Sequence, residues 1–149
     1  MYILIVEDDY RQAELIEESF RKDPYFASAK FDHIRTESDF RSRFEEIARN
    51  PPDAVILDVM LRWMDPVPDM GPPPPEVERE GFWRAGLRNA KMLAQDPRTK
   101  GVHRILYTIS EDVDFEEMDE QSKPHYLPKD AALDPLVDLV RSLVDSKEP

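Results

Sequence analysis

The sequence predicts an α/β fold in which helices cover both faces of a parallel sheet. Three short segments are apolar on both faces and each ends at a polar residue, as buried central strands of such a sheet do. Amphipathic helical patterns lie between them, and 149 residues is the size of one domain. We therefore expect a single doubly wound domain over residues 1–149.

Each expected element has its own local signal. The strands are expected at residues 2–6, about 27–35, 54–57, 104–107 and in a fifth segment that ends at Lys129. Helices are expected after the N-cap Asp9, after a capping box at Thr36, around residues 87–94 and from the N-cap Asp134 onward, with a further helix between the fourth and fifth strands. The expected sheet has five strands in the flavodoxin-like order 2-1-3-4-5.

That strand order gathers polar residues, because the carboxyl ends of parallel strands line one crevice. Glu7, Asp8 and Asp58 converge there, and three neighbouring carboxylates need a cation. All-oxygen ligands select a hard ion such as Mg²⁺. Thr108 adds a hydroxyl and Lys129 adds a positive charge. This set suits a phosphoryl group carried on a carboxylate.

Composition excludes several other kinds of site. With 32 acidic against 20 basic residues the net charge is −12, which argues against direct nucleic-acid binding. The chain has no cysteine, and its three scattered histidines do not suggest a zinc site. It has no apolar run of the ~18 residues that a membrane helix needs, and it opens directly on a strand pattern. We expect a cytoplasmic protein without a membrane partner.

At the polar residues that end the expected strands, the chain resembles the receiver domain of two-component response regulators. The matching motifs are Val6-Glu7-Asp8, Leu57-Asp58, Tyr107-Thr108 and Tyr126-x-x-Lys129, together with Gly86-Leu87 and Asp96-Pro97 around the third helix. The resemblance covers nearly the whole chain outside a proline-rich segment at 62–85. It implies a signalling receiver rather than an enzyme acting on other substrates.

The resemblance also implies roles for the site residues. Asp58 would accept a phosphoryl group, in a Mg²⁺-dependent reaction, from a phosphohistidine on a sensor histidine kinase or phosphotransfer protein, and the receiver could later dephosphorylate itself. Asp8, Asp58 and the backbone carbonyl of Met60 would ligate Mg²⁺, with Glu7 acting through water. Lys129 would pair with a phosphoryl oxygen.

A conformational switch is implied as well. Thr108 would turn toward the phosphoryl group, and Tyr126 would move into the vacated space. The changed surface would signal to a downstream protein target, and a homodimer is compatible with this scheme. Ile109 stands where the family usually has a small residue, so its side chain could crowd the phosphoryl group.

Three other interpretations compete with this one. An unphosphorylated, receiver-like interaction module stays open, favoured by Ile109 and by the proline-rich segment. A phosphatase of the haloacid dehalogenase type needs a second acid two residues after its nucleophile, where this chain has Met60. A nucleotide-binding flavodoxin-like protein needs a phosphate loop rich in glycine or in serine and threonine, and neither crevice turn has one.

Residues 62–85 form an expected insertion between the third strand and the third helix. The segment holds both tryptophans of the chain and four consecutive prolines, which favour polyproline II geometry. We expect an ordered flap beside the phosphorylation site; a protein-docking patch or a disordered linker are the alternatives. Residues 111–121 are strongly acidic, which fits either a solvated helix face or a surface for a basic partner.

Overall fold

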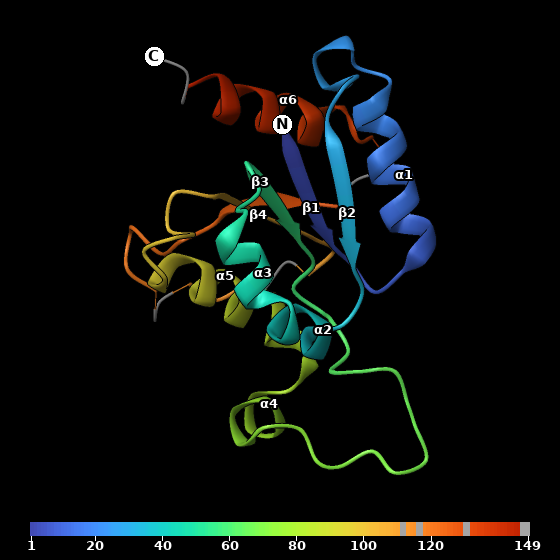
Figure 1. Ribbon diagram of the computed structural model, residues 1–149, viewed down its shortest axis with the longest axis vertical. Helices are drawn as coiled ribbons and strands as arrows, with labels where there is room; N and C mark the ends of the chain where they lie inside the picture. The colour runs from blue at the N-terminus through green and yellow to red at the C-terminus, as the bar shows by residue number, and fades with distance from the viewer. Residues whose placement is uncertain (111–112, 116–117, 130–131, 147–149) are drawn as a thin grey trace.

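Five parallel strands form one sheet in the computed structural model, which describes residues 1–110, 113–115, 118–129 and 132–146. The order across the sheet is β2-β1-β3-β4-β5, so the predicted fold class and strand order are confirmed. Figure 1 shows the sheet between two layers of helices. The strands are β1 (Tyr2–Val6), β2 (Lys30–Ile34), β3 (Ala54–Leu57), β4 (His103–Thr108) and β5 (His125–Pro128).

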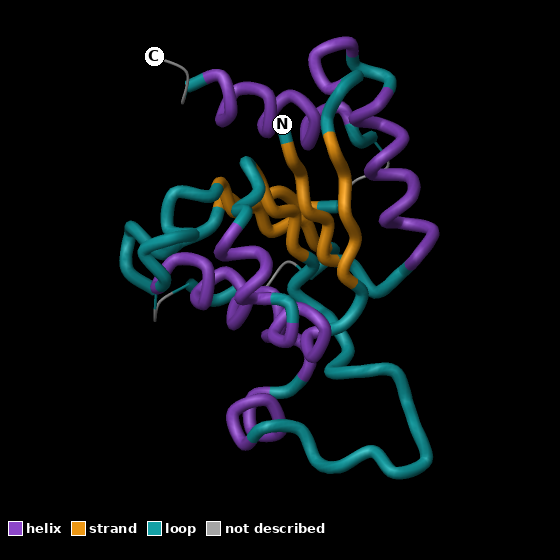
Figure 2. The backbone as a smooth tube through the Cα atoms, viewed as in Figure 1, coloured by secondary structure: helices purple, strands orange, loops and turns teal. Residues whose placement is uncertain are grey.

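Helices and two 3₁₀ turns connect the strands, as Figure 2 shows along the backbone. The helices are α1 (Tyr10–Arg21), α2 (Glu37–Ser42), α3 (Phe44–Arg49), α4 (Pro75–Glu80), α5 (Ala85–Gln95) and α6 (Asp134–Asp145), and the turns are η1 (Pro24–Phe26) and η2 (Phe82–Arg84). Within the described ranges, no helix is long and apolar enough to cross a membrane.

Alternate residues of the central strands pack into opposite layers, because successive side chains of a strand point to opposite faces. In β1, Ile3 and Ile5 belong to the core formed with α1 and α6. Leu4 and Val6 belong to the core formed with α2, α3 and α5. All four side chains are fully buried. The buried, continuous apolar run of this strand is therefore explained by helices on both of its faces.

The prediction of one helix between the second and third strands is wrong in one respect, because the structure divides this helix into α2 and α3. Thr36 caps α2 as expected, its hydroxyl accepting a hydrogen bond from the Asp39 N–H at 3.1 Å. At Arg43 the backbone leaves helical geometry, with φ −95° and ψ 1°. The Arg43 guanidinium there reaches the carboxylate of Asp32 on β2 at 2.5 Å. A long-range ion pair thus accompanies the break.

The expected helix between the fourth and fifth strands is also not observed: the described residues between β4 and β5 contain none. Val113, Phe115 and Met118 instead pack their side chains against the core on the α5 side of the sheet. Four acidic residues of the stretch at 111–121 lie outside the described residues: Glu111, Asp112, Glu116 and Glu117.

Two helix starts differ from expectation. Helix α6 is preceded by Leu133 at the N-cap, so Asp134 is its first helical residue rather than its cap. Within the proline-rich segment, Pro74 keeps polyproline-like dihedral angles, φ −53° and ψ 150°, but Pro75 begins α4. Proline is well tolerated there because the first helical N–H has no partner within the helix.

Candidate functional site

Three carboxylates meet at the carboxyl ends of β1 and β3. The register pairs Val6 with Leu57, and the Asp58 N–H donates to the Val6 carbonyl at 2.9 Å, which places Asp58 beside the residues that follow β1. One carboxylate oxygen from each of Glu7, Asp8 and Asp58 lies within 4.8 Å of the others. Glu7 and Asp58 are buried and Asp8 is half-buried.

Lys129 reaches this cluster from the end of β5. Its N–H donates to the Thr108 carbonyl at 2.8 Å, so the backbone of β4 fixes its position. The Lys129 ammonium lies 2.5 Å from Glu7 Oε1 and 3.1 Å from Asp58 Oδ2. Burial favours the neutral amine, but the carboxylates of Asp58 and Glu7 outweigh it and raise the pKa of Lys129 above its ordinary value. One cation thus bridges two acids.

The surroundings of Glu7 and Asp8 disfavour negative charge on both carboxyl groups. Burial, and then the nearby Asp58 carboxylate, raise the pKa of Glu7 to about 8, although Lys129 opposes this. Burial also raises the pKa of Asp8. Among the described residues, Glu7 Oε2 is buried without a hydrogen-bond partner. Hard oxygen donors, one of them unpartnered, fit a divalent cation.

The backbone around Asp58 is tightly packed. The Met60 N–H donates to Asp58 Oδ1 at 3.3 Å, and the Gly86 N–H donates to the Val59 carbonyl at 3.0 Å. A Cβ atom on Gly86 would lie 2.4 Å from the Asp58 carbonyl oxygen, so only glycine lets α5 approach the strand end this closely. The sequence marked Gly86 by resemblance alone, because nothing local reveals which backbone it touches.

The two predicted switch residues share a neighbour that sequence reasoning missed. Thr108 is fully buried, and its hydroxyl accepts a hydrogen bond from the Ser110 N–H at 3.3 Å. The Tyr126 hydroxyl donates to the Ser110 carbonyl at 2.8 Å, and its ring meets Phe115 edge-on with centroids 6.3 Å apart. Tyr126 is 36% exposed. Both side chains are thus held by one turn after β4, with Tyr126 on the outside.

A cavity of about 390 Å³ opens over the carboxylates. Phe82 and Ile109 stand at its rim, and both are more than half exposed. Ile109 therefore borders the cavity over the carboxylates. The cavity is lined by Glu7, Asp8, Asp9, Gln12, Asp58, Met60, Phe82, Ile109 and Lys129. Thr108 is not among these residues.

The proline-rich segment leaves from the same rim and returns to it. The Leu61 N–H donates to the Phe82 carbonyl at 3.1 Å, which closes the segment at its base. Arg62 Nε lies 3.9 Å from Asp8 Oδ2, so a guanidinium that the sequence analysis did not single out also borders the acids. In Figure 1 the intervening loop projects away from the sheet before it returns as α4.

Comparison with known proteins identifies the fold. The chain matches the receiver domain of a signal transduction histidine kinase from Syntrophus aciditrophicus with a TM-score of 0.67, 22% identity and coverage of 99% of this chain and 92% of that one. It matches the phosphorylated cyanobacterial phytochrome response regulator RcpA with a TM-score of 0.64, 18% identity and coverage of 95% and 89%. The Mn²⁺-bound response regulator Rcp1 gives a TM-score of 0.64, 19% identity and coverage of 95% and 90%.

No family model matches the sequence, and no curated protein matches it. The identities to solved structures are low, so the likeness lies in the course of the backbone. The five parallel strands in the order β2-β1-β3-β4-β5 fit the fold that these TM-scores indicate. The chain therefore has the fold of a response-regulator receiver domain.

Proposed function

We propose that the chain is a phospho-accepting receiver in which Asp58 takes a phosphoryl group from a phosphohistidine on a sensor histidine kinase or phosphotransfer protein. A carboxylate oxygen of Asp58 attacks phosphorus, the new O–P bond forms as the N–P bond breaks, and the imidazole leaves with the bonding electrons. The observation that carries the proposal is the Lys129 ammonium, which contacts Asp58 and Glu7 beside the half-buried Asp8.

A divalent cation, Mg²⁺ in this proposal, fits the same residues. Asp8, Asp58 and the Met60 carbonyl would hold it, with Glu7 acting through water. When bound, it would offset the negative charge shared by the carboxylates and the phosphoryl oxygens. The unpartnered oxygen of Glu7 supports this assignment, as does Mn²⁺ in the Rcp1 structure.

The remaining residues position and report the phosphoryl group. Lys129 would exchange its contact with Asp58 Oδ2 for a phosphoryl oxygen and remain anchored by its backbone bond to Thr108. For the Thr108 hydroxyl to face the phosphoryl group it must give up the Ser110 N–H. Tyr126 must likewise give up the Ser110 carbonyl to turn inward. The turn at Ser110 would thereby pass the change to the β5 edge, where a downstream protein target would detect it.

We also propose that the segment 62–85 acts as a flap over this site. Its base is closed by the hydrogen bond between Leu61 and Phe82, and the Phe82 ring lies at the rim of the acidic cavity. An apolar ring there would limit the approach of water to an aspartyl phosphate. The flap would lengthen the lifetime of the phosphorylated state.

An unphosphorylated interaction module is the competing function, and Ile109 at the cavity rim is the observation that favours it. Incubation with phosphoramidate and Mg²⁺, followed by intact-protein mass spectrometry, separates the two functions. The proposal expects a single phosphoryl adduct on the wild type and none on Asp58→Asn, which keeps the shape of the side chain but lacks the nucleophilic oxygen. An unlabelled wild type that is correctly folded, or a labelled D58N, would contradict it.

A further inference from the structure

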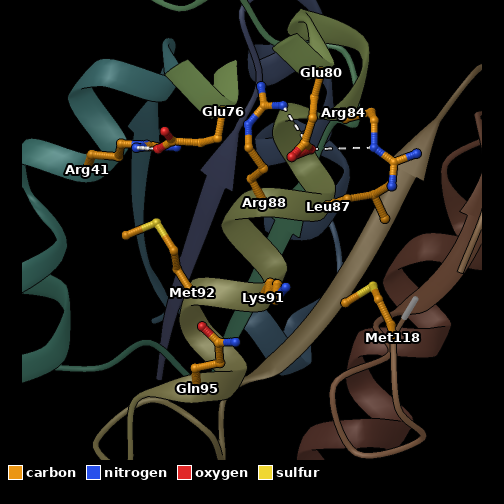
Figure 3. Close-up of a pocket in the computed structure, with 10 residues that line it drawn as sticks. All are labelled: Arg41, Glu76, Glu80, Arg84, Leu87, Arg88, Lys91, Met92, Gln95 and Met118. Carbon is orange, nitrogen blue, oxygen red and sulfur yellow. Dashed lines mark hydrogen bonds and ion pairs between the residues drawn. The ribbon is translucent and has the colours of Figure 1, made fainter. Parts of the chain in front are cut away.

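A second cavity, larger than the acidic one, lies on the face formed by α2, α4 and α5. Its volume is about 480 Å³, within the range of ligand pockets. Figure 3 shows side chains of α5 along its floor and those of α4 and η2 along one wall. The lining residues are Arg41, Glu76, Glu80, Arg84, Leu87, Arg88, Lys91, Met92, Gln95 and Met118.

The cavity is cationic in a strongly acidic protein. Four basic side chains and two acidic ones line it, although the whole chain carries a net charge of −12. Arg84 pairs with Glu80 at 3.6 Å, whereas Lys91 is exposed and has no ion-pair partner among the described residues. Lys91 thus offers an ammonium group to a carboxylate from outside.

The floor of the cavity combines this charge with soft apolar surface. Leu87, Met92 and Met118 line it, and in the view of Figure 3 Lys91 lies between the two methionine side chains. Methionine is flexible and polarizable, so it adapts to varied apolar partners and is common on peptide-binding surfaces. A cationic group that shares a cavity with two methionines is complementary to an acidic residue beside an apolar one.

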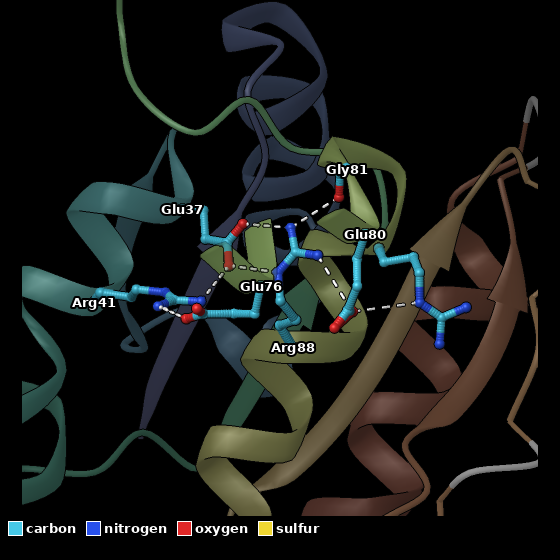
Figure 4. Close-up of polar contacts among 7 residues, drawn as sticks. Glu37, Arg41, Glu76, Glu80, Gly81 and Arg88 are labelled. Carbon is cyan, nitrogen blue, oxygen red and sulfur yellow. Dashed lines mark hydrogen bonds and ion pairs between the residues drawn. The ribbon is translucent and has the colours of Figure 1, made fainter. Parts of the chain in front are cut away.

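Ion pairs around the buried Glu37 fix the shape of the cavity. Figure 4 shows the Arg88 guanidinium between the carboxylate of Glu37, the Gly81 carbonyl and Glu80. Arg41 also bridges Glu37, at 3.1 Å, to Glu76, at 2.7 Å. These contacts join α2, α4 and α5, so the walls are already formed without a ligand and little ordering cost remains for binding.

We propose that this cavity is a docking site for an acidic, amphipathic segment of a protein partner. A carboxylate of the segment would pair with Lys91, and an adjacent apolar side chain would pack against Met92 and Met118. This site goes beyond the phosphoryl chemistry, since it lies on the α4–α5 face and shares no lining residue with the acidic cavity. Charge complementarity in an otherwise acidic protein selects this occupant.

The test is selection of displayed random dodecapeptides on the full chain, followed by titration of the enriched peptides into protein labelled at its methionine methyl groups. We expect enriched peptides with acidic and apolar residues side by side, and NMR shifts concentrated at Met92 and Met118. Met60, in the acidic cavity, is the internal control. Asp58→Asn should bind these peptides as the wild type does, so the outcome is independent of phosphorylation.

Lys91→Glu should weaken peptide binding about tenfold or more, because it replaces an attraction by a repulsion. Lys22→Glu, at an exposed lysine after α1, is the matched control and should bind normally. Enrichment of peptides without acidic residues, shifts centred on Met60, or equal affinity for Lys91→Glu would each overturn the proposal. It would also be overturned if citrate alone shifted Met92 and Met118 and no peptide did, because the cavity would then be a small-anion site.

Discussion

Arg88 of α5 and Glu37 of α2 form a buried, two-pronged ion pair. Arg88 Nε lies 2.8 Å from Glu37 Oε2, and Arg88 Nη2 lies 2.7 Å from Glu37 Oε1. Glu37 is fully buried and Arg88 is 9% exposed. Arg88 Nη2 also donates to the Gly81 carbonyl at 2.9 Å (Figure 4). The pair therefore holds the turn that carries Phe82 to the acidic cavity.

Replacing Arg88 with methionine should destabilise the protein by roughly 3 kcal/mol, because it leaves a buried carboxylate without its main partner. Arg41 still contacts Glu37, so the loss of stability should lie at the lower end of the range for broken buried ion pairs. Urea unfolding followed by circular dichroism measures it. The double variant R88M/E37M should recover part of the stability; a double variant less stable than R88M would show that uncompensated charge is not the cause.

Asp8→Asn should lower Mg²⁺ affinity and phosphorylation together, because it removes a direct oxygen ligand of the proposed cation site. Asp9→Asn is the matched control: it neutralises the adjacent acid, and asparagine caps a helix as well as aspartate does. Isothermal titration with Mg²⁺ and labelling by phosphoramidate give the two measurements. Unchanged Mg²⁺ affinity in D8N would move the cation to other ligands.

Glu7 should make the metal-free protein less stable as the pH rises. Its pKa is raised to about 8 in the folded state, so the stability it contributes is present in acid and is lost as the pH rises to about 8. Glu7→Gln removes this titration. In EDTA, the difference in unfolding free energy between E7Q and the wild type should therefore grow in favour of E7Q as the pH rises from about 5 to 8. The increase should be at most about 1.4 kcal/mol per pH unit. Parallel pH profiles of the two proteins would contradict the raised pKa.

Phe82→Ala should shorten the lifetime of the phosphoryl group on Asp58 several-fold, because the apolar rim of the acidic cavity is opened to water. Replacing residues 64–74 with a short Gly-Ser turn keeps Phe82 at the rim of the cavity, so it should shorten the lifetime less than F82A does. Tyr10→Ala, at an exposed aromatic residue that does not line the cavity, is the control. Mass spectrometry measures the loss of the phosphoryl group over time. Equal rates of loss in F82A and the wild type would contradict the proposed flap.

Much of the fold could be predicted from local pattern. Continuous apolar runs such as 2–6 have to be buried on both faces, which requires a parallel sheet with helices on both sides. Polar residues directly after those strands, Asp58 among them, then meet at one edge of the sheet. The sequence by itself therefore predicted a parallel sheet with helices on both faces and, given the flavodoxin-like strand order, the neighbourhood of the acids and of Lys129.

Other features depend on contacts between distant residues and could not be predicted from local pattern. The break at Arg43 coincides with an ion pair to Asp32 on another element, and the start of α4 at Pro75 coincides with an ion pair between Arg41 and Glu76. The same holds between β4 and β5: a helix was expected there, but the described residues contain none, and Phe115 packs its side chain against the core.

At the site, the sequence specified which groups meet, and only the tertiary structure decided their state. The raised pKa of Glu7 depends on its burial next to Asp58, and the position of Tyr126 depends on its hydrogen bond to Ser110. Both are properties of three-dimensional proximity. The buried pair of Arg88 and Glu37 belongs here too, because two charges 51 positions apart give no sign in the sequence that they will leave water together. These charged groups lose their hydration only where the packed helices and strands exclude water, so their burial depends on the complete tertiary structure.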